Sequence, residues 1–275
     1  MVSLTTSLGL VSLGATGAVA ADALGAYNVD PNAVSVSGLS SGGFMSAQIG
    51  VAYSDVFTVG FGVLAGGPYD CARNQPCMFD QVPSIITPIA NMKAWSGNKI
   101  DTVSNLNSRK IYLWEGSADV TVGLNVMNAL QAQLSHFDNS ADVSYVVTEG
   151  AVHTFPTDFD GAGDNPCSLS ISPYISNCGY DGAGAALQWM YGTLHARNTG
   201  TLSGSVLSFA QSASFGADGM DTTGYLYVPE SCQSGSIVCR LHVALHGCLQ
   251  SHTNIGMDFV DNTGYNMWAG KNIPS

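Results

Sequence analysis

The sequence predicts an α/β fold in which a mostly parallel sheet is flanked by helices. Short runs rich in β-branched and aromatic residues alternate along the chain with longer stretches whose apolar residues recur three and four positions apart. The chain has 275 residues, 45% of them hydrophobic, so one large domain can bury its own core. Such an alternation of strands and helices is typical of a parallel sheet covered by helices.

The first predicted unit is a strand, a turn and a helix. From residue 33 the sequence reads AVSVSGLSSGGFMSAQIGVAY, a β-type run followed by a Gly/Ser turn and then by apolar residues at helical spacing up to Val51. Buried strands are predicted next at residues 57–65 (FTVGFGVLA), 110–114 (KIYLW) and 143–147 (VSYVV), and helices at 125–137 and 183–197.

The later part of the chain contains further predicted elements. Residues 199–214 are rich in Gly, Ser and Thr and could serve as an interdomain linker, but we do not interpret them as one. Strands at 225–228 (YLYV) and 241–245 (LHVAL) and a helix at 262–269 follow. They could form a separate small domain, but the simpler prediction adds them to the same sheet, so we expect residues 22–275 to be one domain.

The charge composition excludes several kinds of partner. Lys and Arg number 8 and Asp and Glu number 20, a net charge of −12, and only 10% of residues are charged, against about 25% in ordinary soluble domains. Because no Lys/Arg cluster occurs, we expect neither nucleic acid nor an anionic lipid surface as a partner. A surface with so few charged residues is suited to a neutral or apolar substrate. Past the N-terminal segment, no run of about 20 apolar residues predicts a membrane span.

Six of the seven cysteines form three close pairs in sequence. The pairs are Cys71 with Cys77, Cys167 with Cys178, and Cys232 with Cys239. This spacing favours disulfides in an oxidising compartment. Metal binding is the alternative, but no CxxC or HxxxH spacing accompanies the cysteines, so we expect no metal site. Cys248 is left over, either as a buried free thiol or as half of a bridge whose partner lies outside this chain.

The first 21 residues resemble a secretory signal peptide. They carry no charge, are rich in Leu, Val and Ala, and contain Ala18-Val19-Ala20 just before Ala21, as at a cleavage site. No basic residue follows Met1, however, and the alternative is a flexible apolar N-terminus of a mature chain. We expect a signal peptide at residues 1–21 and a secreted, extracellular protein.

The turn Gly38-Leu39-Ser40-Ser41-Gly42 matches the GxSxG motif. This motif places a serine hydroxyl in a sharp turn above the carboxyl edge of a sheet, and its glycines give room for the bend. The short match is weak alone, but here it lies between a predicted strand and a predicted helix, where a nucleophile elbow belongs. Ser40 is therefore the candidate nucleophile. The alternative is a small-residue turn without catalytic function.

A serine nucleophile needs a base, and the base needs an acid that fixes its tautomer. Asp119 follows the strand predicted at 110–114, and His153 follows the strand predicted at 143–147. The order Ser, Asp, His, each on its own strand-end loop, is that of α/β-hydrolases. Glu115 and Glu149 are rivals for the acid, but Glu115 follows directly on its strand and Glu149 shares the histidine loop, so Asp119 is preferred.

The remaining histidines are expected to have packing or surface roles. They are His136, His195, His242, His246 and His252.

An oxyanion hole requires two backbone N–H donors. One is expected from Ser41, the residue after the nucleophile. The second normally follows an earlier strand, but here the candidate comes late, where the LHVAL strand ends in His246-Gly247-Cys248. We therefore expect a circularly permuted α/β-hydrolase-like chain in which the Cys248 N–H is the second donor. The alternative is an ordinary strand end carrying a disulfide cysteine.

Six motifs extend this interpretation over nearly the whole chain from about Tyr27. They are VSVSGLSSGGFM, AGGPYDCARNQ, NMKAWSGN, GAVHTFPTDF, SPYISNC and LHVALHGCLQS. Together they resemble the fungal extracellular poly(3-hydroxybutyrate) depolymerases, a single-domain, circularly permuted α/β-hydrolase type. The resemblance implies the same roles for Ser40, Asp119, His153, Ser41 and Cys248.

The resemblance also implies an incomplete C-terminus. Members of the family continue for several tens of residues past the segment that matches residues 271–275, with another strand, a cysteine and a tryptophan that lines the crevice. The LHVAL strand would then be an exposed sheet edge, and the missing cysteine would explain the unpaired Cys248.

We expect an extracellular serine esterase that hydrolyses poly(3-hydroxybutyrate) and related polyesters through an acyl-enzyme to hydroxyacids or short oligomers. The protein is expected to be a monomer that acts on an insoluble polyester or ester substrate without metal or organic cofactor. A secreted carboxylesterase or feruloyl esterase is the nearest alternative. A non-catalytic, polymer-adsorbing truncated protein is the alternative from another class.

Overall fold

The computed structural model of the chain describes residues 23–73, 76–137, 142–211 and 220–271. The expected signal peptide at 1–21 lies outside the described residues.

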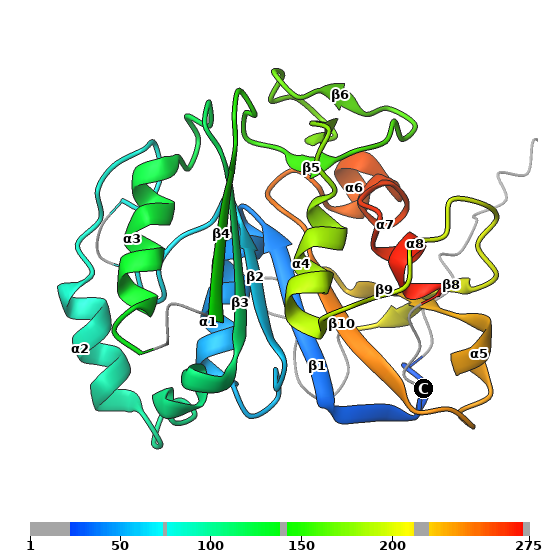
Figure 1. Cartoon of the computed structure of the whole chain (residues 1–275), viewed down its shortest axis with the longest axis horizontal. Coiled ribbons are helices and arrows are strands. Elements are labelled where there is room, and N and C mark those ends of the chain that lie inside the picture. The colour runs from blue at the N-terminus through cyan, green and yellow to red at the C-terminus, as the bar shows by residue number, and fades with distance from the viewer. Residues whose placement is uncertain (1–22, 74–75, 138–141, 212–219, 272–275) are drawn as a thin grey trace, which may run out of the picture.

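A five-stranded parallel sheet forms the centre of the fold (Figure 1). Its strands, in spatial order, are β10 (Cys239–Leu245), β1 (Val29–Leu39), β2 (Gly60–Leu64), β3 (Lys110–Gly116) and β4 (Val143–Thr148). Strand β10, which follows every expected triad residue in the sequence, lies beside β1, the strand that leads to Ser40. This arrangement is the one expected of a permuted chain, and it confirms the predicted parallel sheet.

Alternate residues of a strand point to opposite faces of the sheet, and in these strands both sets include large apolar side chains. Helices therefore cover both faces. On one face lie α1 (Ser41–Ala52), α2 (Ile86–Trp95) and α3 (Leu124–Leu134), whose side chains pack with those of Val36, Phe61 and Leu113. On the other lie α4 (Gly182–Tyr191), α7 (Asp258–Asn262) and α8 (Tyr265–Ala269), which pack with Leu64 and Trp114. Figure 1 shows α3 and α4 on opposite sides of the strands.

Smaller elements surround the central sheet. A second parallel sheet lies above α4 in Figure 1, and an antiparallel hairpin flanks β10. These elements are η1 (Val103–Ser108), β5 (Phe155–Thr157), β6 (Asn165–Pro166), β7 (Ile175–Asn177), β8 (Ser205–Ala210), β9 (Thr223–Val228), α5 (Glu230–Gln233) and α6 (His252–Ile255).

Two predicted helices end earlier or divide, each time at a glycine. The helix expected over 183–197 ends at Tyr191, where Gly192 takes a φ of 78°. The helix expected over 262–269 is divided between α7 and α8, which are separated by Thr263 and by Gly264 with a φ of 89°. Glycine adopts such values without the steric penalty of a side chain, so it stops a helix readily.

The prediction that residues 225–228 join the central sheet is wrong. They belong to β9, which pairs antiparallel with β8 and with no strand of the central sheet among the described residues. Residues 205–210 of the Gly/Ser/Thr-rich segment are strand rather than linker. Of the two late strands predicted for the central sheet, the one at 241–245 does enter it, as β10.

The six paired cysteines form three disulfides, Cys71–Cys77, Cys167–Cys178 and Cys232–Cys239. Cys248 is a free, exposed thiol, so the expectation that it could be buried is wrong.

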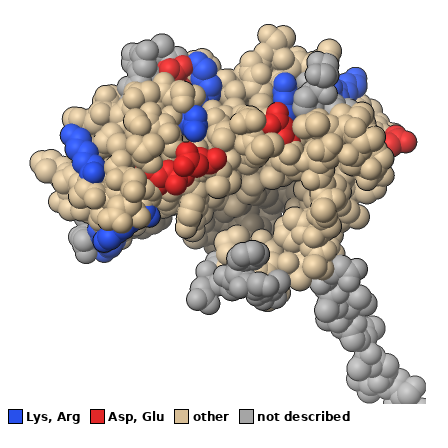
Figure 2. Space-filling view, turned by 90° about the horizontal axis from the view of Figure 1, so that it is seen from below, with Lys and Arg blue, Asp and Glu red and all other residues tan. Residues whose placement is uncertain are grey.

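Surface charge is sparse, as the composition requires. Figure 2 shows Lys and Arg side chains scattered over the face seen from below in Figure 1. Within the described part of the chain, no helix is long and apolar enough to cross a bilayer. The same residues contain no group of three or more His, Cys, Asp or Glu side chains arranged to hold a metal ion.

Candidate active site

Ser40 occupies a strained turn between β1 and α1. Its φ of 56° and ψ of −120° lie in a region that residues with a side chain rarely adopt. Backbone hydrogen bonds hold the turn, because the Ser40 N–H donates to Leu64 O at 2.9 Å and Ser40 O accepts from the Phe44 N–H at 2.8 Å. This is the geometry of a nucleophile elbow, in which strain presents the hydroxyl at the carboxyl edge of the sheet.

The glycines of the GxSxG motif allow β10 to pass close to this turn. A Cβ added to Gly42 would lie 2.2 Å from Leu245 O, and one added to Gly38 would lie 2.5 Å from the backbone of Gly42. Real side chains do not approach so closely, so both positions require glycine. The motif therefore depends on β10, a strand from the opposite end of the sequence.

Asp119 and His153 meet at the carboxyl edge of the sheet, on the loops that follow β3 and β4. His153 Nδ1 lies 2.6 Å from Asp119 Oδ2, and both residues are buried. The backbone N–H groups of Thr121 and Val122 donate to Asp119 Oδ1 at 2.6 and 3.0 Å. These bonds fix the carboxylate, which in turn keeps a proton on Nδ1 and leaves Nε2 free to act as a base.

Electrostatics favour an ionised Asp119. Burial raises the pKa of this carboxyl, but the hydrogen bond to His153 and the positive charge of that ring outweigh burial, so the pKa is lowered. The aspartate is thus suited to orient the imidazole and to stabilise its protonated form.

The rival acids are placed differently. Glu115 is completely buried, and burial, followed by the negative charge of Asp119, raises its pKa from 4.5 to about 10. Its Oε1 accepts a hydrogen bond from the Gly116 N–H at 2.9 Å. Glu115 is therefore neutral near pH 7 and cannot serve as the orienting carboxylate. Glu149 is exposed in the turn after β4.

Hydrogen bonds to neighbouring segments hold the loop that carries His153. Ala151 O accepts from the Ala118 N–H at 2.9 Å, which joins this loop to the loop of the aspartate. The Val152 N–H donates to Cys167 O at 3.1 Å, and the Ser170 hydroxyl donates to His153 O at 2.9 Å. The imidazole is therefore presented by backbone that is held on both sides.

The segments that carry the two expected oxyanion donors both adjoin Ser40. Ser41 is the first residue of α1, so its N–H belongs to the free N–H groups at the helix N-terminus. Cys248 follows Gly247 in the turn after β10. A Cβ added to Gly247 would lie 3.1 Å from Ser40 Cβ, which places this turn beside the serine.

The other histidines do not join this pair. His136, His195, His246 and His252 are exposed. His242 hydrogen-bonds through both ring nitrogens to serine hydroxyls of β1, at 2.7 and 2.8 Å, and burial lowers its pKa to about 3. It is a neutral packing residue, as expected.

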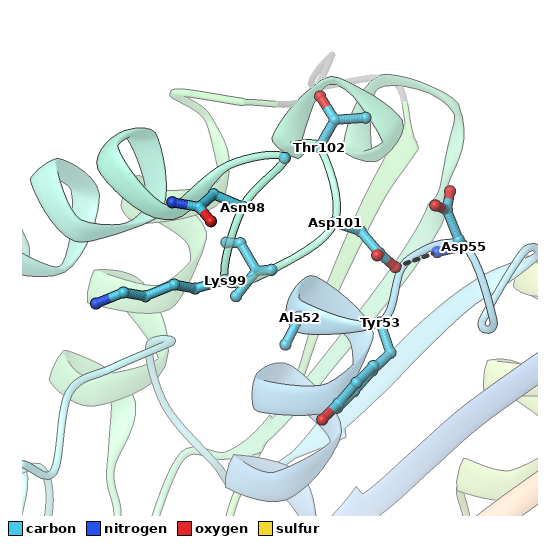
Figure 3. Close-up of a pocket in the computed structure, with 9 residues that line it drawn as sticks. Ala52, Tyr53, Asp55, Asn98, Lys99, Asp101 and Thr102 are labelled. Atoms are coloured by element: carbon cyan, nitrogen blue, oxygen red, sulfur yellow. Dashed lines mark hydrogen bonds between the residues drawn. The ribbon is translucent and has the colours of Figure 1, made fainter.

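Figure 3 shows a pocket at the other end of α1, with a volume of about 400 Å³. Its lining includes Tyr53, Lys99 and Asp101, and Asp101 Oδ2 accepts a hydrogen bond from the Asp55 N–H at 2.8 Å. Twelve helical residues separate this end of α1 from Ser40, a distance of about 18 Å. The pocket is therefore separate from the candidate active site.

A parallel sheet with a strained serine turn and a hydrogen-bonded aspartate–histidine pair at its carboxyl edge defines an α/β-hydrolase-type serine hydrolase. No protein-family model matches the sequence. The chain belongs, however, to the polyhydroxybutyrate depolymerases, and the resemblance noted in the sequence is confirmed. It is 74% identical over 266 residues to the polyhydroxybutyrate depolymerase of Talaromyces funiculosus, which covers 96% of this chain and 78% of that protein.

Other relatives agree with this assignment. The poly(3-hydroxybutyrate) depolymerase of Delftia acidovorans is 44% identical over 260 residues, 90% of this chain and 52% of that protein. The crystal structure of PHB depolymerase from Penicillium funiculosum matches with a TM-score of 0.89 and 73% identity over 93% of this chain and 80% of that chain. A PHB depolymerase with a serine replaced by alanine, in complex with an R3HB trimer, matches with the same TM-score and 72% identity over the same shares of the two chains.

Proposed function

We propose that this protein is a secreted serine esterase that hydrolyses poly(3-hydroxybutyrate) and related polyesters to hydroxyacids or short oligomers. The observation that carries the proposal is the 2.6 Å contact between Asp119 and His153 at the same sheet edge as the Ser40 turn. Membership of the depolymerase family supplies the substrate class, and the relative in complex with an R3HB trimer supports it.

The reaction proceeds through an acyl-enzyme. The Ser40 hydroxyl attacks the ester carbonyl while His153 Nε2 takes the hydroxyl proton, and Asp119 stabilises the imidazolium. The proton then passes to the departing alcohol. Water then attacks the acyl group while the same nitrogen takes one of its protons. As the bond from the acyl carbon to Ser40 Oγ breaks, this proton passes to Oγ, which releases the acid and restores the serine. The Ser41 and Cys248 N–H groups bind the developing oxyanion, contributing about 3 kcal/mol each.

An enzyme that acts on an insoluble polymer must adsorb to it through its own surface. Exposed apolar side chains that suit this contact lie next to the candidate site. Val120 is 78% exposed and adjoins Asp119, while Leu249 is 60% exposed and adjoins Cys248. Phe79 is 67% exposed, and its N–H donates to the backbone of the Asp119 loop at 2.8 Å. These side chains can contact polyester without the cost of removing charges from water.

Secretion is part of the proposal. The three disulfides support an oxidising compartment, since such bonds persist mainly outside the cytosol. The expected signal peptide at residues 1–21 would direct the chain there.

The Ser40→Ala variant tests the proposed function. We expect turnover of a poly(3-hydroxybutyrate) film to fall by about 10⁴-fold or more, while adsorption to the film stays at the parent level. The exposed Ser234→Ala variant is the matched control and should retain full turnover. An organophosphate should form one adduct per chain with the parent and none with Ser40→Ala. Unchanged turnover in Ser40→Ala overturns the assignment of the nucleophile.

Substrate preference is tested separately. We expect hydroxybutyrate release from polymer to exceed ferulate release from feruloyl esters at equal enzyme concentration. The reverse order favours the feruloyl esterase alternative. A folded parent protein that forms no organophosphate adduct favours the non-catalytic, polymer-adsorbing alternative.

A further inference from the structure

Gln250 is a buried polar residue that the mechanism above does not use. Its side chain is enclosed, with 1% of the residue exposed. Oε1 accepts a hydrogen bond from the Gly247 N–H at 2.7 Å, and Nε2 donates to Pro173 O at 2.9 Å and to Tyr174 O at 3.2 Å. Both polar atoms of the amide are therefore bonded to backbone, one to a residue 3 positions earlier and the other to residues 77 and 76 positions earlier.

These bonds connect two parts of the candidate site. Tyr174 O, which accepts from Gln250, also accepts from the Phe155 N–H at 2.8 Å, two residues after His153. The Ser170 hydroxyl donates to His153 O at 2.9 Å. Residues 170–174 thus contact the histidine loop on one side and Gln250 on the other. Through Gln250, the turn at Gly247 is joined to the loop of the base.

The turn that Gln250 holds is strained and lies against the serine. Leu249 has a φ of 62°, a left-handed value that is costly for a leucine. Gly247 lies close enough to Ser40 that an added Cβ would be 3.1 Å from the serine Cβ. A strained turn keeps its conformation only if the surrounding structure holds it. Two side chains bond to Gly247: His246, the preceding residue, through Nδ1 at 2.8 Å from Gly247 O, and Gln250, which also ties the turn to residues 173 and 174.

We propose that Gln250 is a positioning residue that holds the Cys248 N–H in the oxyanion hole and keeps it aligned with His153. This inference rests on the proposed function, because it takes the Cys248 N–H as an oxyanion donor. Gln250 does not touch substrate and acts through the turn at Gly247. An oxyanion donor must lie within about 3 Å of the developing charge, so a small displacement of this turn weakens transition-state binding more than substrate binding.

Two variants of Gln250 and one matched control test this role. Gln250→Met removes all three hydrogen bonds, and Gln250→Glu keeps an acceptor for Gly247 while placing an oxygen against the carbonyls of Pro173 and Tyr174. The control is Gln133→Met, because Gln133 is equally buried and bonds to the backbone N–H and O of Tyr69 at 2.8 and 3.0 Å. Both glutamines are thus bound to backbone, but Gln133 makes no bond to the loops of the triad among the described residues.

The measurements are kcat and KM on a soluble short-chain ester and the inhibition constant of an alkylboronic acid. The boronic acid forms a tetrahedral adduct with Ser40 and places an oxygen in the oxyanion hole. For both Gln250 variants we expect kcat to fall about 10- to 100-fold with KM changed less than about threefold, and the inhibition constant to rise by a similar factor. Gln133→Met should lose thermal stability but keep kcat and the inhibition constant.

Two results overturn the positioning role. In the first, the folded Gln250 variants have the same kcat as Gln133→Met. In the second, kcat falls in the Gln250 variants but the inhibition constant of the boronic acid stays unchanged. If Gln250→Met does not fold, the near-isosteric Gln250→Glu decides the question alone. Ser40→Ala is measured alongside: full activity in that variant refutes the proposed function and this inference together, whereas activity that depends on Ser40 but not on Gln250 refutes only the inference.

Discussion

Replacing Glu115 with glutamine tests whether the buried carboxyl of β3 is neutral in the folded protein. Burial and the charge of Asp119 raise the pKa of Glu115 from 4.5 to about 10. The unfolded chain loses this proton above about pH 4.5, whereas the folded protein keeps it up to about pH 10. Between these values the folded state binds more protons than the unfolded state, so the free energy of unfolding falls as the pH rises.

A glutamine matches the protonated carboxyl in shape and cannot ionise, so Glu115→Gln removes this pH dependence. At pH 7 the solution is about 2.5 units above the unfolded-state pKa, which corresponds to about 3 kcal/mol. We therefore expect the stability of the variant relative to the parent to increase by about 3 kcal/mol between about pH 4.5 and pH 7. The pKa of Asp119 is lowered in the folded protein, so the ionised Asp119 stabilises the fold and this stabilisation is lost as the pH falls. The loss occurs in the variant and in the parent alike, so it does not contribute to the difference between them.

The assay is urea denaturation at several pH values, with the free energy of unfolding extrapolated to water. The exposed Glu149→Gln is the matched control, and its stability should stay within about 0.5 kcal/mol of the parent at every pH. If the stabilities of Glu115→Gln and the parent run parallel across the pH range, Glu115 is ionised in the folded protein and the reasoning is refuted.

Three further variants test the site and its supports. Asp119→Asn should lower kcat by about 10⁴-fold, because the imidazole is then held in the wrong tautomer. Pre-steady-state acylation measures this loss, and a loss below about tenfold contradicts the role. Gly42→Ala should destabilise the protein by about 1 to 3 kcal/mol or prevent folding, since its Cβ would lie 2.2 Å from Leu245 O; an unchanged melting temperature contradicts the close approach. Replacing Cys167 and Cys178 with serine opens a disulfide that spans 11 positions, so we expect the free energy of unfolding to fall by about 3 kcal/mol, as measured by calorimetry. We also expect a lower kcat in steady-state kinetics, because the Val152 N–H of the histidine loop donates to Cys167 O.

The central sheet and the residues at its carboxyl edge were predictable from local patterns. The runs that became β2 and β3 are continuous and apolar because both faces are covered, and such runs stand out in a sequence. The GLSSG turn could be placed because a strand and a helix flank it. Asp119 and His153 could be selected because each follows such a strand, and the structure brings them together.

Other features depend on contacts that a local pattern does not contain. The run YLYV looks the same whether it joins the central sheet or pairs with β8, and only the tertiary arrangement decides between them. Helix α2 was not predicted, since Pro88 lies in its first turn and is read as a helix breaker, although Ile85, Ile89 and Met92 recur at helical spacing. Gln250 gave no signal, because two of its partners are backbone carbonyls 77 and 76 positions away. Nor does sequence show that Glu115 is buried without ionising.

The pairing of β1 with β10 has a consequence for how the protein is made. Ser35 of β1 and His242 of β10 are in hydrogen-bond contact although 207 positions separate them, and the serine turn needs Leu245 beside its glycines. During translation Ser40 is synthesised early, whereas β10, the strand that lies against its turn, is synthesised about 200 residues later. We therefore expect the nascent polypeptide to have no esterase activity until β10 emerges, and folding to be slow because such a long loop must close first.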